Sequence, residues 1–269
     1  MTTESSYRLS DEQLGQVIPL LKGADSVELK MSVAPSQHRA TIQGLPIDPV
    51  EAQPRQVYFF DTPDLALDKA GVVVRARRIQ GGRGDTVVKL RPVDPDDIPS
   101  ELRKSKSVNI EVDFIPGGFV CSASFKGRAS GAEIREAVNG ETSLSKLFSR
   151  DQRDAYAAHA PEGIQLDSLV PLGPTFLLKT MFNPDELQQR RVVVEVWLYP
   201  DGSRILELSM KCLPSEAFQV AVEARHYLGG LGIDLTGVQQ TKTRAALDFY
   251  RDEHKAAEEA ADSVLARPA

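Results

Sequence analysis

The sequence is poor in the residues that form disulfide frameworks and metal centres. It contains two cysteines in 269 residues, Cys121 and Cys212, and their wide separation excludes a disulfide framework and a cysteine-based zinc site. The four histidines show no metal-ligand spacing. They are His38, His159, His226 and His254. Long runs of uncharged apolar residues are also missing, so the sequence predicts no segment that crosses a membrane.

An excess of positive charge is missing as well. Lys and Arg number 32 against 38 Asp and Glu, which gives a formal net charge of −6. Proteins that coat nucleic acids are usually basic, so this balance argues against long nucleic acid as the partner. The 41% of hydrophobic residues is typical of a globular protein and excludes wholesale disorder. The N-terminal stretch MTTESSYRLSDEQ has no signal-peptide core, and we expect a cytoplasmic protein without a membrane partner.

The order of patterns along the chain favours one main domain. Strand-like segments occur on both sides of a helical stretch, and a single sheet with a helical insertion explains this more simply than two domains. Ser10 and Gln13 have capping-box spacing and predict the start of a short helix. We expect a last helix at 241–260 with a frayed end. The predicted units are an N-terminal segment at 1–23, a main domain at 24–250 with a helical insertion near 131–160, and a C-terminal tail at 251–269.

Six segments alternate between aliphatic and charged residues. They are 26–33, 72–79, 86–91, 108–114, 191–198 and 206–212. Successive side chains of a strand point to opposite faces, so Val27 and Leu29, for example, lie opposite Glu28 and Lys30. The aliphatic face must be covered by helices, whereas the charged face either meets solvent or lines the interior of a closed barrel. The pattern alone leaves both alternatives open.

In the barrel interpretation, the charges on this face predict a polar ligand. Clustered Lys and Arg side chains suit phosphate oxygens. Interleaved carboxylates would hold divalent cations that bridge the same oxygens. The sequence therefore predicts a small phosphate compound as the ligand.

Several motifs support the barrel. In chain order they are SVELK at 26–30, YFFDTPDLALDKAGVVVRARR at 58–78, DTVVKLRP at 85–92, NIEVD at 109–113, RRVVVEVWLYPDGSRILELSMK at 190–211 and TKTRAAL at 241–247. Together they resemble the signatures of the CYTH, or triphosphate tunnel, superfamily: an E-x-E-x-K strand, an aromatic-Asp-Thr-Pro turn, an Arg-x-Arg strand and a late helix that contains a lysine.

The resemblance implies an α+β fold, a closed eight-stranded antiparallel β-barrel that forms a tunnel with flanking helices. It also implies one of several activities, since the family includes inorganic, thiamine and RNA triphosphatases and class IV adenylate cyclases. These proteins bind a triphosphate through Lys and Arg of the lumen and through Mg or Mn held by carboxylates.

The resemblance and the strand faces together assign the site. The expected phosphate-binding residues are Lys30, Arg75, Arg77, Lys89, Arg91, Lys179, Arg191, Lys211 and Lys242. The expected metal ligands are Glu28, Glu111, Asp113, Glu195 and Glu207. Glu28, Lys30 and Lys89 are the expected catalytic residues. The rival explanation is that these acidic and basic residues form ordinary cross-strand salt bridges on an exposed face. Such a salt bridge stabilises a protein by less than about 1 kcal/mol.

Four positions depart from the family pattern. Ser26 replaces the first Glu of E-x-E-x-K, and Asn109 replaces an Arg. The strand that usually reads E-x-E-x-E carries Ser209 and Lys211 after Glu207. Because metal affinity rises with the number of carboxylates, we expect a weakened metal site that keeps its ability to bind anions.

Three functions are consistent with these observations. The first is metal-dependent hydrolysis of an inorganic, thiamine or nucleoside triphosphate. The second is a catalytically degraded barrel that binds a polyphosphate or nucleotide. The third is a class IV-type adenylate cyclase. The 131–160 helices could cap a tunnel mouth or form a homodimer interface, and the sequence does not decide between these roles.

Overall fold

The computed structural model of the protein describes residues 9–115, 117–233 and 242–265. The polar start predicted at 1–8, the first residue of the predicted last helix and the end of the predicted tail at 266–269 lie outside the described residues.

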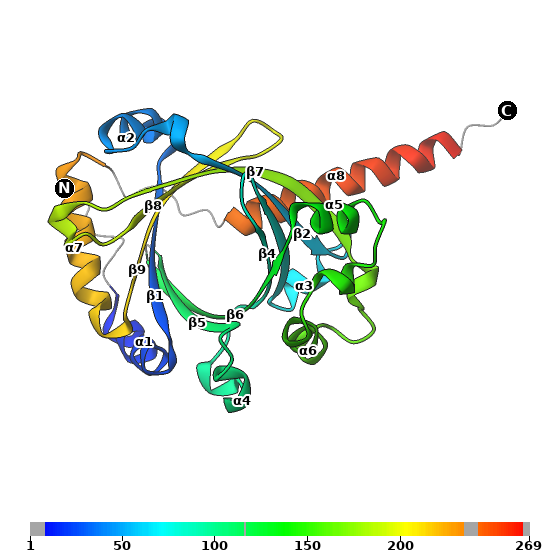
Figure 1. Ribbon diagram of the computed structural model, residues 1–269, viewed down its shortest axis with the longest axis horizontal. Helices are drawn as coiled ribbons and strands as arrows, with labels where there is room; N and C mark the ends of the chain where they lie inside the picture. The colour runs from blue at the N-terminus through cyan, green and yellow to red at the C-terminus, as the bar shows by residue number, and fades with distance from the viewer. Residues whose placement is uncertain (1–8, 116, 234–241, 266–269) are drawn as a thin grey trace.

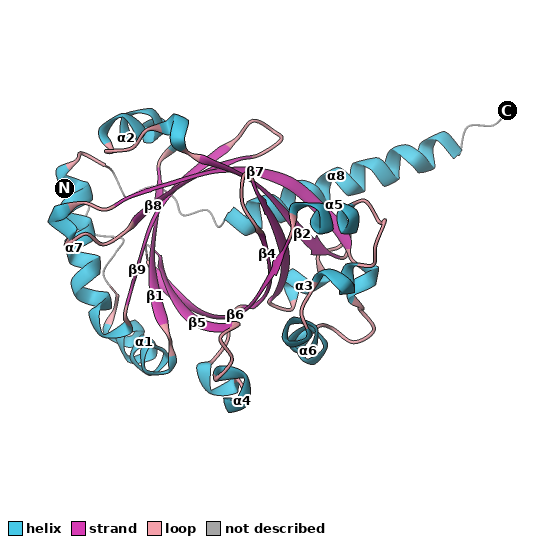
Figure 2. Ribbon diagram, in the orientation of Figure 1, coloured by secondary structure: helices cyan, strands magenta, loops and turns pink. Residues whose placement is uncertain are grey.

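Nine strands form one closed barrel (Figures 1 and 2). They are β1 (Ser26–Val33), β2 (Gln53–Asp61), β3 (Val72–Ile79), β4 (Gly84–Leu90), β5 (Val108–Ile115), β6 (Gly118–Ala129), β7 (Val170–Phe182), β8 (Val192–Leu198) and β9 (Arg204–Cys212). Around the ring their order is β1-β5-β6-β4-β3-β2-β7-β8-β9. The ring closes where β9 pairs antiparallel with β1, with Val27 opposite Cys212 and Val33 opposite Leu206.

The prediction of a closed α+β barrel is confirmed, but the prediction of eight strands, all antiparallel, is wrong. In a ring with an odd number of strands the directions cannot alternate all the way round, so one neighbouring pair must be parallel. That pair is β1 and β5, with Ser26 opposite Glu111 and Leu29 opposite Phe114. All other neighbouring strands are antiparallel.

Helices surround the barrel wall. They are α1 (Asp11–Gly23), α2 (His38–Gly44), α3 (Ala66–Lys69), α4 (Ser100–Arg103), α5 (Gly131–Val138), α6 (Arg150–His159), α7 (Ala217–Gly230) and α8 (Lys242–Leu265). Figure 1 shows α1 and α7 beside β1 and β9, and α5 and α6 on the side of β4. Among the described residues, no helix combines the length and the apolar character needed to span a bilayer.

The aliphatic strand faces point outward and form the core beneath these helices. Val27 and Leu29 of β1 belong to the same buried cluster as Val17 of α1 and Val220 of α7. The helix start predicted at Ser10 is confirmed, because the Ser10 backbone N–H donates to Gln13 Oε1 at 2.9 Å in a capping box. Burial of this aliphatic surface is the main force that holds the helices to the wall.

Helix α8 packs against the inward-facing side of the barrel. Its residues Ala246, Leu247 and Tyr250 are buried in an apolar cluster with Val57, Leu177, Trp197 and Ile205, all on inward faces of the strands. The C-terminal end, which the sequence predicts to fray, is helical as far as Leu265. Its alanine-rich sequence has high helix propensity, and no proline interrupts it before Pro268.

Candidate functional site

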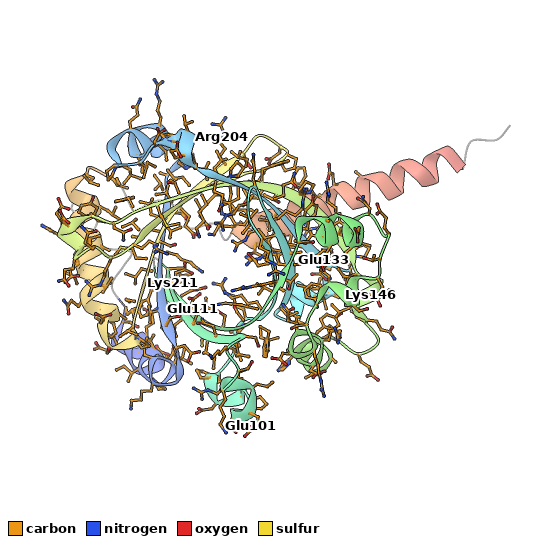
Figure 3. All side chains as sticks on the ribbon, viewed as in Figure 1. Glu101, Glu111, Glu133, Lys146, Arg204 and Lys211 are labelled. Atoms are coloured by element: carbon orange, nitrogen blue, oxygen red, sulfur yellow. The ribbon has the colours of Figure 1, made fainter. Side chains whose placement is uncertain are left out.

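The charged strand faces meet inside the barrel. Cross-strand partners lie on the same face of a sheet, so the registers that pair Glu28 with Lys211 and with Asp113 place all three in the interior. Figure 3 shows the labelled Lys211 and Glu111 inside the ring of strands. Asp113 is completely buried and Glu111 is 6% exposed. A solvated sheet face would leave such carboxylates in water, so the structure favours the interior alternative.

Asp113 is the centre of a group of cations. Its Oδ2 lies 2.8 Å from Lys30 Nζ, 3.5 Å from Arg91 Nη2 and 3.7 Å from Lys89 Nζ. Burial favours the neutral carboxyl group, but Lys30 and Lys89 outweigh it and hold the pKa of Asp113 below its ordinary value. Three cations thus converge on one buried carboxylate oxygen.

Lys89, a member of this group of cations, has a lowered pKa. Its burial, together with the nearby charges of Lys30 and Arg91, lowers the pKa of Lys89 to about 8, although Asp113 opposes the shift. The pKa of Lys30 changes in the opposite direction: burial lowers it, but Glu28 and Asp113 together raise it. An anion beside Lys89 would therefore stabilise its charged form.

Three carboxylates lie close enough to share a metal ion. One oxygen from each of Glu28, Glu111 and Asp113 lies within 4.8 Å of the others, and we call these residues the carboxylate triad. Asp113 Oδ1 is buried and has no hydrogen-bond partner among the described residues. An all-oxygen set with an unsatisfied buried oxygen suits Mg²⁺ or Mn²⁺. The residues present therefore fit a divalent cation. Ser26, which stands where the family pattern has a glutamate, supplies no carboxylate and donates a hydrogen bond to Glu111 at 3.2 Å.

An arginine cluster faces the interior from β2 and β3. It consists of Arg55, Arg75 and Arg77, with Asp85 of β4 as its carboxylate. Arg77 Nη2 lies 2.6 Å from Asp85 Oδ2, whereas Arg75 Nη2 lies 3.9 Å from Asp85 Oδ1. Burial and the charge of Arg77 lower the pKa of Arg75 to about 10. The Nε atoms of Arg55 and Arg75 are buried without a hydrogen-bond partner among the described residues, so donors are available for an anion.

The turn that leads into β3 is fixed by the Asp-Thr-Pro motif. Asp61 Oδ1 accepts hydrogen bonds from the backbone N–H groups of Thr62 at 2.7 Å and Leu67 at 2.8 Å, and Oδ2 accepts one from Asp68 at 3.0 Å. The carboxylate thus holds the chain between β2 and α3 in one conformation. This motif is structural, and it positions the strand that carries Arg75 and Arg77.

Glu195 and Glu207 form a separate group with Lys242. Lys242 Nζ enters the interior from the first turn of α8 and lies 2.5 Å from Glu195 Oε2 and 2.6 Å from Glu207 Oε1. Lys179 Nζ is 3.1 Å from Glu195 Oε1. Burial opposes ionisation of Glu195, but Lys242 and Lys179 hold its pKa well below the ordinary value. Two of the five expected metal ligands are therefore paired with lysine rather than joined to the carboxylate triad.

Most of the expected phosphate-binding residues lie on inward faces of the strands, whereas Arg191 lies outside the strands. It precedes β8 and is exposed. Lys211 lies on the inward face with a side chain that is 54% exposed. The sequence analysis missed Arg55 and Lys126. Lys126 continues the alternation of Ser122 and Ser124 on the inward face of β6, a signal that was present in the sequence.

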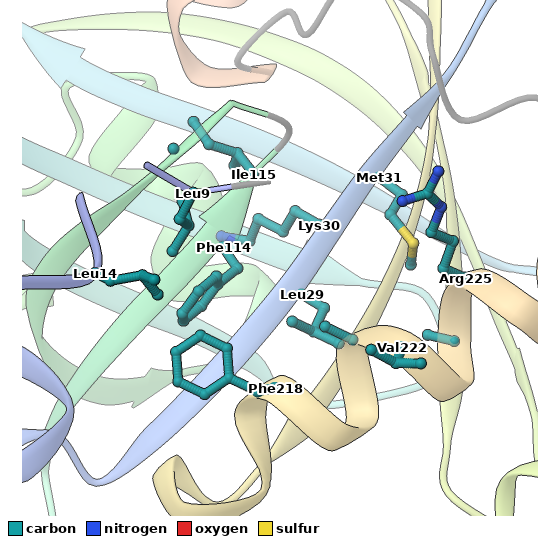
Figure 4. Close-up of a pocket in the computed structure, with 13 residues that line it drawn as sticks. Leu9, Leu14, Leu29, Lys30, Met31, Phe114, Ile115, Phe218, Val222 and Arg225 are labelled. Carbon is teal, nitrogen blue, oxygen red and sulfur yellow. The ribbon is translucent and has the colours of Figure 1, made fainter. Parts of the chain in front are cut away.

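A cavity outside the barrel wall is unsuited to a phosphate compound. It has a volume of about 270 Å³ and lies between β1, α1 and α7 (Figure 4). Its lining includes Leu29, Phe114, Phe218 and Val222, and it is apolar except at Lys30 and Arg225. The concentration of charge is inside the barrel and not here.

Comparisons with known proteins identify the fold. No family model matches the sequence, and no curated protein matches it. A candidate adenylate cyclase from Bacillus halodurans superposes with a TM-score of 0.56 over 82% of this chain and 98% of its own, at 16% identity. A candidate adenylyl cyclase from Hippeastrum, described as having a dominant triphosphatase activity, gives a TM-score of 0.57 over 79% and 91%, at 15% identity. The chain has the barrel fold of these two proteins.

The match confirms the resemblance to the CYTH superfamily at the level of fold. In this barrel, Lys30, Arg75, Arg77 and Lys89, which the resemblance assigns to phosphate, all lie on inward faces of the strands. The carboxylate triad that could hold a metal ion lies on the neighbouring strands β1 and β5.

Proposed function

We propose that this triphosphate tunnel binds a small triphosphate compound in its interior and hydrolyses a phosphoanhydride bond with the help of Mg or Mn. The observation that carries the proposal is the group of Lys30, Lys89 and Arg91, all within 3.7 Å of the single carboxylate oxygen Asp113 Oδ2. Three cations that converge on one buried oxygen, in an interior that excludes much of the solvent, are suited to bind a multiply charged anion.

In this proposal the chain acts by positioning and electrostatics. Lys30, Lys89 and Arg91 hold the phosphate oxygens on one side, and Arg75 and Arg77 hold them on the other. A divalent cation bound to the carboxylate triad would neutralise charge on the phosphate oxygens and favour attack by water. Phosphoryl transfer needs little covalent chemistry from the protein, so no nucleophilic side chain is required.

The interior favours a short ligand. The apolar cluster around Leu247 and Tyr250 of α8 fills the inward side of the barrel near the turn between β8 and β9. The chain as a whole is acidic, with a net charge of −6, which disfavours long nucleic acids. We therefore propose inorganic triphosphate, thiamine triphosphate and a nucleoside triphosphate as the compounds to test.

Phosphate release tests the proposal directly. The purified protein is incubated with Mg²⁺ or Mn²⁺ and with tripolyphosphate, thiamine triphosphate or ATP in turn, and free phosphate and cyclic AMP are both measured. We expect phosphate from at least one compound, and loss of both release and binding in Lys89→Ala. Arg78→Ala is the matched control, because the Arg78 guanidinium bonds to Gln56 on the outward face. Failure to bind or cleave any of the three compounds would refute the proposal.

A binding protein without catalysis is the second candidate. It is favoured by the ion pair between Lys211 and Glu111, which engages a carboxylate of the triad with an ammonium group. Tight binding of tripolyphosphate with no phosphate release would establish it. Cyclic AMP formation from ATP would instead establish the cyclase, the activity suggested by the names of the two structural neighbours.

A further inference from the structure

Lys211 stands where the CYTH pattern has a carboxylate. It lies on β9 directly opposite Glu28 of β1, and its Nζ forms an ion pair with Glu111 Oε2. Figure 3 shows the two labelled side chains together inside the ring. The Lys211 side chain is 54% exposed, whereas that of Glu111 is 8% exposed. Lys211 therefore contacts a buried carboxylate while much of its own surface remains open to a ligand.

The carboxylate triad needs positive charge from its surroundings. Three carboxylates with oxygens within 4.8 Å repel one another strongly when all are ionised. Lys30 Nζ serves two of them, at 3.2 Å from Glu28 Oε2 and 2.8 Å from Asp113 Oδ2. Glu111 is the remaining member, and Lys211 is the cation that it contacts among the described residues. Each carboxylate of the triad thus already lies beside a lysine ammonium group.

Because of these contacts, Asp113 and Glu111 differ in their ability to bind a metal ion. Asp113 Oδ1 is buried and has no hydrogen-bond partner among the described residues, so this part of the triad still has a ligand atom to offer. Glu111 Oε2 is already engaged by Lys211 and by the Ser26 hydroxyl at 3.2 Å. A cation that approached Glu111 would have to displace the tethered ammonium group.

We propose that the Lys211 ammonium takes the place of a divalent cation at Glu111 of the carboxylate triad, so that a polyphosphate meets a tethered positive charge there. This inference rests on the proposed function for its ligand. It predicts that polyphosphate binding depends only weakly on free metal, and that the protein holds fewer divalent cations than the same chain with a carboxylate at position 211.

Two charge-changing variants test this role. Lys211→Met removes the charge with little change in length, and Lys211→Glu places a carboxylate where the family pattern has one. Lys104→Met is the matched control, because the Lys104 side chain, directly after α4, is 73% exposed and pairs only with Glu101 among the described residues. Circular dichroism and thermal unfolding show whether each variant is folded. Lys211 is half exposed, so we expect all three to fold.

Calorimetry with tripolyphosphate, in EDTA and in Mg²⁺, gives the first readout. We expect the original chain to bind in both conditions. We expect Lys211→Met to lose about tenfold more affinity in EDTA than in Mg²⁺, and Lys104→Met to change neither value. Equal losses for Lys211→Met with and without Mg²⁺ would overturn the inference, since they would assign Lys211 to phosphate binding alone.

Electron paramagnetic resonance with Mn²⁺ alone gives the second readout, which needs no phosphate ligand and no activity. We expect Lys211→Glu to bind one more Mn²⁺ per chain than the original protein. An unchanged Mn²⁺ stoichiometry would overturn the inference and leave Lys211 as an ordinary salt-bridge residue. Absence of tripolyphosphate binding in the original chain would count against the proposed function, while the Mn²⁺ comparison would still decide the role of Lys211.

Discussion

The lowered pKa of Lys89 leads to a quantitative prediction about anion binding. Lys89 has a pKa of about 8 in the ligand-free protein, because burial and the neighbouring cations disfavour its charged form. At pH 7 roughly nine tenths of Lys89 is protonated, and at pH 9 roughly one tenth is. A bound anion needs the charged form, so the contribution of Lys89 to the affinity should fall about tenfold between these pH values.

The assay compares the original chain with Lys89→Met. Tripolyphosphate itself titrates in this range, so the useful quantity is the ratio of the two affinities at each pH, from which the titration of the ligand cancels. Isothermal titration calorimetry in EDTA at pH 7, 8 and 9 supplies the ratio. The neighbouring Lys30 and Lys211 have raised pKa values and stay charged over the whole range.

The direction of the effect follows from proton linkage. A lysine with a lowered pKa releases its proton as the pH passes 8, and a ligand that requires that proton then binds more weakly. The advantage of the original chain over Lys89→Met should therefore shrink with rising pH. A ratio that stays constant from pH 7 to pH 9 would show that Lys89 does not face the bound anion, and the electrostatic reasoning for this site would be wrong.

Three further predictions concern the interior and the wall. Asp113→Asn removes the negative charge that balances the surrounding cations, so we expect urea unfolding to show a free energy of unfolding lower by about 3 kcal/mol. Tripolyphosphate should restore part of this stability. Full stability of the variant without ligand would contradict the prediction. Gln152→Ala removes a hydrogen bond that Gln152 donates to the Phe125 carbonyl at 3.0 Å and one that it accepts from the Thr86 hydroxyl at 3.0 Å. We therefore expect the free energy of unfolding to fall by about 2 kcal/mol and the tripolyphosphate affinity to stay unchanged. Arg55→Ala should weaken tripolyphosphate binding about tenfold by calorimetry, and an effect no larger than that of the outward-facing Arg78→Ala would remove Arg55 from the site.

Alternation in the sequence was sufficient to put most of the interior charges on one strand face, whereas the resemblance was needed to place that face inside a barrel. In β1, β3 and β9 one face is aliphatic and lies under helices, so the opposite face could be assigned from the sequence alone. Lys30 and Arg75 were placed correctly for this reason. Lys211 was also placed on the inward face, and its departure from the family pattern was visible in the sequence.

Other features could not be predicted by this method. In β2 both faces are buried, with Phe60 in the outer core and Phe59 in the interior cluster, so the strand shows no alternation and Arg55 was overlooked. Position 54 is a proline, which further weakens the strand pattern. The grouping of Glu195 with Lys242 depends on how α8 packs, a long-range contact that no local pattern contains.

The closure of the barrel has a consequence for how the chain is made. Strand β1 pairs with β9, and the paired residues are about 180 positions apart. While the chain emerges from the ribosome, β1 can pair with β5, but its other edge stays unpaired until β9 has been synthesised. A nascent or prematurely terminated chain that lacks β9 keeps an open sheet with unpaired edges, which is a template for association with other chains. Correct folding of this protein should thus depend on synthesis of β9 and on protection of the early strands until that point.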